Sequence, residues 1–71
     1  MRLLAKDADG AMHLLSVADI YYDEEDRELT VTTAADLDYS VEDIDRYSAE
    51  TLMRDLFETG KAELPPRFTL E

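Results

Sequence analysis

The apolar side chains of this chain repeat every second residue before position 34 and every three to four residues after position 48. Alternation of apolar or aromatic residues with polar ones, as in residues 19–33, is typical of half-buried strands. After residue 48, Leu52, Met53, Leu56 and Phe57 follow a helical spacing. The change of period predicts an α+β fold, in which an antiparallel meander of three to four strands precedes a helix packed on one sheet face.

Short polar turns divide the first half of the chain into strands, which we predict over residues 2–6, 11–17, 19–22 and 27–33. In the first hairpin, a four-residue turn over 7–10, with Gly10 at positive φ, pairs Leu3 with Leu14 and segregates the two faces best. A two-residue turn at Asp9-Gly10 would mix the two faces, and a three-residue loop with a bulge at Gly10 remains an open alternative. In the second hairpin, pairing across the acidic turn places Ile20 opposite Leu29 and leaves Tyr21 facing solvent.

Two capping patterns precede the helical segment. Ser40 followed by acidic residues predicts a short helix over 41–46, and Ser48 begins a main helix over 49–59 that ends at Gly60. A single helix across both segments also fits the apolar spacing. The predicted core combines apolar residues of the hairpins and the helix: Leu3, Ala5, Met12, Leu14, Ile20, Tyr22, Leu29, Val31, Leu52, Met53, Leu56 and Phe57.

Two adjacent prolines set the predicted end of the domain, because proline donates no backbone hydrogen bond. Residues 62–64 fit a short edge strand before them. We therefore predict one domain over residues 1–64 and a flexible tail over 65–71.

Charge limits the classes of function. The 71 residues include 18 acidic and 7 basic ones, a net charge of −11, and residues 19–50 hold twelve of the acids but only two arginines. Such a chain lacks the cations that bind nucleic acid or anionic membranes. It has no cysteine and no long apolar run, which favours a cytoplasmic protein without disulfides. The same acidity also suits a salt-rich cytoplasm.

No pattern of residues predicts catalysis or metal binding. His13 is the only histidine, and Ser16 points to the opposite face of the same strand, so no nucleophile accompanies it. The turn over 7–10 fails as a calcium loop, because Ala5 and Ser16 occupy ligand positions. We interpret the acidic turn over 23–26 as a solvated loop. We therefore expect a protein that is not an enzyme and has no cofactor and no metal site.

These observations favour a small acidic, non-enzymatic protein-interaction or regulatory module of bacterial or phage type. Its expected partner-binding residues are an exposed aromatic residue and acidic residues of the central segment: Tyr21, Asp19, Glu28, Asp38, Glu42 and Asp45. The concentration of charge supports a second hypothesis, an acidic DNA-mimic inhibitor of a nucleic-acid-binding protein. Apolar residues without a place in the predicted core, namely Leu4, Leu15 and Val17, favour a homodimer.

Overall fold

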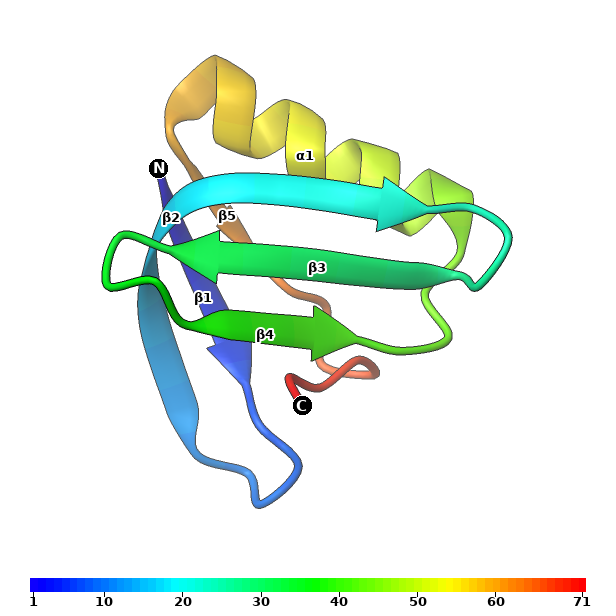
Figure 1. Cartoon of the computed structure of the whole chain (residues 1–71), viewed down its shortest axis with the longest axis horizontal. Coiled ribbons are helices and arrows are strands. Elements are labelled where there is room, and N and C mark those ends of the chain that lie inside the picture. The colour runs from blue at the N-terminus through cyan, green and yellow to red at the C-terminus, as the bar shows by residue number, and fades with distance from the viewer.

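The structure, a computed structural model of residues 1–71, is a five-stranded sheet with one helix packed against it (Figure 1). The elements in chain order are β1 (Arg2–Lys6), β2 (Met12–Asp23), β3 (Glu28–Thr33), β4 (Asp38–Val41), α1 (Arg46–Thr59) and β5 (Lys61–Glu63). The sheet order is β4-β3-β2-β1-β5, antiparallel except for the parallel pair β1 and β5. The predicted α+β fold with a packed helix is confirmed.

The long strand β2 joins the two segments that we predicted as separate strands, 11–17 and 19–22. Its pairing with β3 shifts register between Val17 and Asp19, so that Ala18 is a bulge residue. The bulge lets Val17 and Ile20 both face the core, which strict alternation would forbid. β2 bends strongly along its length, and its two halves belong to two differently oriented parts of the sheet (Figure 1).

The predicted register of the first hairpin is wrong by one residue. Leu3 pairs with Leu15, not with Leu14, because the turn takes in five residues, 7–11. One Asp7 carboxylate oxygen accepts the N–H groups of Asp9 and Ala11, both at 2.9 Å, and so closes this longer turn. A slip of one residue exchanges the two faces of a strand, and Leu14 therefore points to solvent.

The predicted helix over 41–46 is also wrong, because residues 38–41 form β4. Val41 lies opposite Leu29 on the core side, and both side chains are fully buried. The second hairpin has the predicted faces but a shifted register, in which Ile20 lies opposite Val31. The residues around Ser40 resemble a helix cap locally. They form β4 instead, because this segment pairs with β3 and covers the edge of that strand.

Helix α1 begins at Arg46, three residues before the predicted start. Its cap is Asp45, whose carboxylate accepts the Ser48 N–H at 3.1 Å, and Ser48 is itself a buried residue of the first turn. The helix ends as predicted at Gly60, which has a φ of 80° and donates its N–H to the Leu56 carbonyl.

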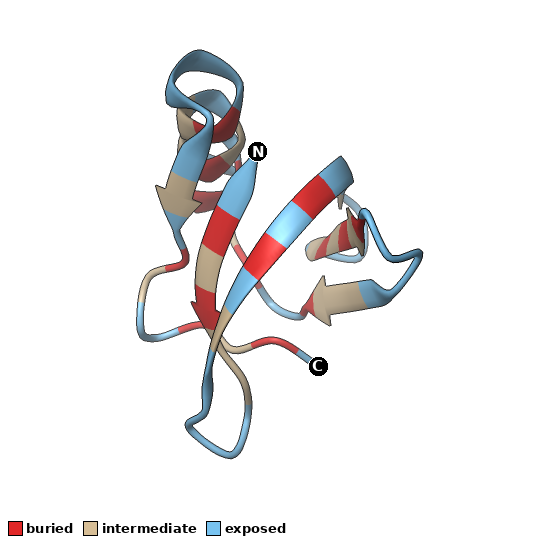
Figure 2. Ribbon diagram, turned by 90° about the vertical axis from the view of Figure 1, so that its left-hand side faces the viewer, coloured by how far each residue is buried: buried red, intermediate tan, exposed pale blue.

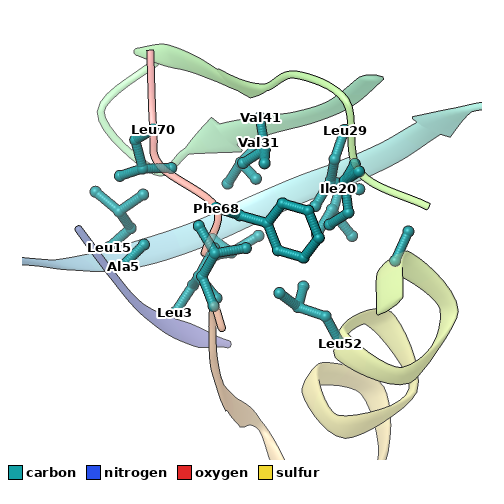
Figure 3. Close-up of a cluster of buried hydrophobic side chains, with 14 of the residues drawn as sticks. Leu3, Ala5, Leu15, Ile20, Leu29, Val31, Val41, Leu52, Phe68 and Leu70 are labelled. Carbon is teal, nitrogen blue, oxygen red and sulfur yellow. The ribbon is translucent and has the colours of Figure 1, made fainter. Parts of the chain in front are cut away.

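The core fills the concave side of the bent sheet and is closed by α1 and by the C-terminal segment (Figures 2 and 3). Residues 65–71, expected to be a flexible tail, pack into this core: Phe68 is 9% and Leu70 2% exposed. The Phe68 ring lies between the sheet and α1, and the Leu70 N–H donates to the Lys6 carbonyl at 2.8 Å. The C-terminal segment is therefore part of the fold.

The core differs from the predicted set in ways that follow from these changes. Seven predicted members are buried, namely Leu3, Ala5, Ile20, Leu29, Val31, Leu52 and Leu56, while Tyr22 and Met53 are partly buried. Three are exposed instead: Met12, Leu14 and Phe57. Eight buried hydrophobic residues were not in the predicted core: Leu15, Val17, Val41, Ile44, Ala49, Leu64, Phe68 and Leu70.

Candidate functional site

The bend in β2 gives the sheet two outward-facing surfaces. The first, here called the acid–hydroxyl face, lies on the second half of β2 and on β3 and β4, and comprises Asp19, Tyr21, Glu28, Thr30, Thr32, Asp38, Ser40 and Glu42. The second, here called the cationic groove, lies on β1, β2 and β5 and is lined by Arg2, Leu4, Leu14, Lys61, Ala62 and Glu63.

The strand register arranges the acid–hydroxyl face in rows across the sheet. Asp19, Thr32 and Asp38 form one row, and the Thr32 hydroxyl donates to Asp38 at 2.8 Å. Two residues further along the strands, Tyr21, Thr30 and Ser40 form a row of hydroxyl groups. From the rise per residue in a strand, adjacent rows lie roughly 6–7 Å apart.

Tyr21 is the most prominent side chain of this face. It is 65% exposed, as the sequence analysis predicted, whereas the neighbouring Tyr22 turns inward and donates its hydroxyl to the Ile44 carbonyl at 2.8 Å. Tyr21 therefore presents a flat aromatic ring between two acidic rows, where it is free to contact another molecule.

The other acidic row carries a cluster of carboxyl groups. Glu28 and Glu42 lie near Glu71, whose backbone N–H and carbonyl both bond to Ser40, at 2.8 and 3.1 Å. The hydrogen bond and negative charge of Glu42, with a smaller contribution from Glu28, raise the pKa of Glu71 above its usual value. Folding thus brings like charges together at the edge of β4.

This repulsion predicts an unusual dependence of stability on pH. Because the pKa of Glu71 is raised on folding, unfolding releases a proton, so stability falls as the pH rises through the interval from the ordinary glutamate pKa to the raised one. We expect Glu42→Gln to raise the thermal midpoint at pH 7 and to have less effect as the pH falls below this interval. Melts of wild type, Glu42→Gln and the helix control Glu58→Gln over pH 3–8 measure this; equal shifts for both variants at pH 7 would contradict it.

Asp45, the remaining predicted partner-binding residue, lies away from this face and has a structural role. It caps α1, and Arg67 Nη2 lies 3.4 Å from its Oδ1 atom. Hydrogen bonds from Ser48 lower the pKa of Asp45, and the charge of Arg67 adds to the effect. The structure therefore brings together Asp19, Tyr21, Glu28, Asp38 and Glu42, but not Asp45.

The cationic groove is the largest hollow of the surface, with a volume of about 460 Å³. Leu4 and Leu14 are paired neighbours at its floor, and Leu14 is 63% exposed. Beside them, Arg2 and Lys61 are paired on β1 and β5. Met12, 56% exposed, and Lys6 extend the same surface along β1 and β2. An apolar strip thus runs between basic side chains.

The cations of this groove are unpaired. Arg27, Arg46 and Arg67 all form ion pairs with acidic residues, but Arg2, Lys6 and Lys61 form none. Three of the seven basic residues of a strongly acidic chain are therefore gathered, without partners, on one surface. The sequence pattern did not indicate this surface, because the predicted register places Leu14 in the core. Two signals were available: Arg2, Leu4 and Lys6 alternate on one face of the first strand, and residues 1–18 hold two basic and two acidic residues, unlike the acidic segment after them.

The only histidine of the chain is bonded to the turn of the first hairpin. His13 Nε2 lies 2.7 Å from Asp7 Oδ2, and this hydrogen bond is the main cause of the lowered pKa of Asp7. Asp7 also closes the turn after β1, so the pair holds the hairpin together. No group of three or more His, Cys, Asp or Glu side chains is arranged to hold a metal ion.

No helix of the structure combines the length and apolar character needed to cross a bilayer. In comparisons with protein-family models, curated proteins and solved structures, none matches this chain significantly.

Proposed function

We propose that this protein is a small, non-enzymatic interaction module that binds a basic region of another protein through its acid–hydroxyl face. The observation that carries this proposal is the placement of Asp19, Asp38 and Tyr21 on one exposed side of β2, β3 and β4. Carboxylates pair well with arginine and lysine, and an exposed aromatic ring attracts the same cations.

The arrangement of the face fits a partner with several cations. Asp19 and Asp38 are separated by one strand, which puts them about 9–10 Å apart by ordinary sheet spacing. Between the acidic rows, the hydroxyl groups of Thr30 and Ser40 offer further acceptors and donors. A charged face of this kind speeds association and makes binding sensitive to salt.

Inhibition by DNA mimicry is a narrower form of the same proposal. Four acidic residues, Asp19, Asp38, Glu28 and Glu42, lie in two rows on this one surface, and this favours the narrower form, although other acidic residues, among them Asp45, lie elsewhere. Under it, the basic partner is a nucleic-acid-binding protein, and duplex DNA competes with this chain for the partner's site.

Capture of partners with wild type and matched variants tests the proposal. We expect Asp19→Asn/Asp38→Asn and Tyr21→Ala each to retain less than about a tenth of the wild-type partner, since an interface anchor commonly contributes more than a tenfold change in affinity. Glu25→Gln/Glu58→Gln, which removes the same charge from outside the face, should bind as wild type. The bound protein, identified by mass, should be basic and should be released by 0.5 M salt.

Each result has a defined meaning. If both double variants lose the same amount of captured partner, binding depends only on net charge, and the proposal that the acid–hydroxyl face is the binding site is refuted. A captured protein that is acidic, or one retained by Tyr21→Ala, would also refute it. Displacement of the captured protein by duplex DNA supports mimicry, whereas failure of DNA to displace it leaves the broader interaction module and removes the narrower form.

A further inference from the structure

We propose that the cationic groove is a second, independent binding site, and that its occupant is a partner segment in which an apolar side chain is flanked by acidic residues. The proposal concerns a different surface from the acid–hydroxyl face and does not depend on it. It is carried by the combination of the exposed Leu14, the half-buried Leu4 beside it and unpaired cations at one place.

The apolar strip of the groove can accommodate one or two apolar side chains of a partner. Leu4 and Leu14 lie side by side on paired strands, and Met12 continues the strip. Covering this strip removes apolar area from water, which is the main driving force of association. The volume of about 460 Å³ falls in the range of sites that hold a compact group.

The basic residues around the groove indicate which residues should flank the partner's apolar side chain. Arg2 and Lys61 lie at one end of the strip and Lys6 at the other, and no acidic residue of the chain pairs with them. Glu63 is the only acid lining the groove. Of the four arginines outside the groove, three form ion pairs with acidic residues, and the chain as a whole keeps a large negative charge. Carboxylates on both sides of the apolar group would therefore meet free cations.

A second copy of the chain fits this surface poorly. Packing two grooves face to face would bring Arg2, Lys6 and Lys61 against their own equivalents, with one Glu63 from each copy to offset them. The net charge of −11 on each chain adds repulsion over longer distances. The expected homodimer therefore gains no support from this groove, and an acidic segment of another protein fits better.

The test uses full-length protein and a set of labelled twelve-residue peptides, each with a central Leu-Phe pair flanked by two glutamates, two glutamines or two lysines on each side. We expect the glutamate peptide to bind in fluorescence anisotropy, with weaker binding as salt is raised, and the glutamine peptide not to bind. Any binding of the lysine peptide should occur at the acid–hydroxyl face and should be unchanged in Leu14→Ser. Leu14→Ser and the double variant Arg2→Glu/Lys61→Glu should each reduce the affinity for the glutamate peptide about tenfold or more.

Two variants serve as matched controls. Tyr47→Ser removes an exposed apolar side chain at the far end of α1, and Arg54→Glu reverses an unpaired arginine on the same helix; both should bind as wild type. Leu14 is exposed, so Leu14→Ser should keep its fold, which circular dichroism checks. Equal binding of the three peptides, no binding of any, or unchanged binding of the glutamate peptide by Leu14→Ser would each overturn the proposal. So would a dimer in sedimentation that Leu14→Ser abolishes.

Discussion

Phe68→Ala is expected to unfold most of the protein at room temperature. Phe68 is 9% exposed and packs between the sheet and α1, so its removal leaves a cavity among Leu3, Leu52 and Ile20 (Figure 3). Such a truncation costs about 3–5 kcal/mol, and a core of this size supplies about the same free energy of unfolding. Urea denaturation followed by circular dichroism measures the change.

The matched control for this experiment is the other phenylalanine. Phe57 is 65% exposed on α1, and Phe57→Ala should change the free energy of unfolding by less than about 0.5 kcal/mol. The sequence pattern alone predicts the opposite order, because it places Phe57 in the core and Phe68 in a tail. A variant Phe68→Ala as stable as Phe57→Ala would show that the C-terminal segment does not pack as described.

Leu15→Ala should be the second strongly destabilising substitution, with a cost of about 2–5 kcal/mol. Leu15 is 7% exposed and lies opposite Leu3, whose side chain is fully buried. The adjacent Leu14 is 63% exposed, so Leu14→Ala should cost less than about 1 kcal/mol. Thermal unfolding of the two variants compares the same chemical change on opposite faces of one strand.

This pair of leucines decides the register of the first hairpin. The reverse order, with Leu14→Ala the more damaging change, would restore the register predicted from the four-residue turn. It would also place Leu14 in the core and remove the apolar floor of the cationic groove. The stability measurement therefore checks the geometry on which the groove proposal rests.

Alternation of side chains allowed the fold class and the two faces of the second hairpin, but not its register, to be predicted, because Ile20 and Leu29 each lie between residues that face the other side. The helix was equally clear from Leu52 and Leu56, and its end from Gly60. These sequence patterns are local, and the structure that each pattern favours agrees with the tertiary structure.

The remaining features depend on contacts between distant segments. In the first hairpin, two adjacent leucines allow Leu3 to pair with either Leu14 or Leu15. The hydrogen bonds to Asp7 lengthen the turn and so select the pairing with Leu15. The residues around Ser40 fit a helix cap, but Val41 pairs with Leu29 in the sheet, and this contact is not visible in the local sequence. The burial of Phe68 depends on a space between α1 and the sheet that no short pattern records.

The two candidate surfaces were predictable to different degrees, because one depends on local alternation and the other on contacts between distant segments. The acid–hydroxyl face follows from the alternation around Tyr21, although Asp45 belongs to the helix cap. The cationic groove required Arg2 and Lys61, nearly sixty residues apart in the sequence, to become neighbours through the parallel pairing of β1 and β5. That parallel pairing had no counterpart in the predicted meander.

The positions of the two chain ends affect how affinity tags should be attached. Glu71 is bonded to Ser40, so a purification tag fused after it would emerge beside the acid–hydroxyl face. The Met1 carbonyl accepts the Val17 N–H at 2.7 Å, next to Arg2, so an amino-terminal tag would crowd the groove. The exposed turn around Asp9 and Gly10 projects away from the rest of the chain (Figure 1), and an epitope inserted there leaves the acid–hydroxyl face open.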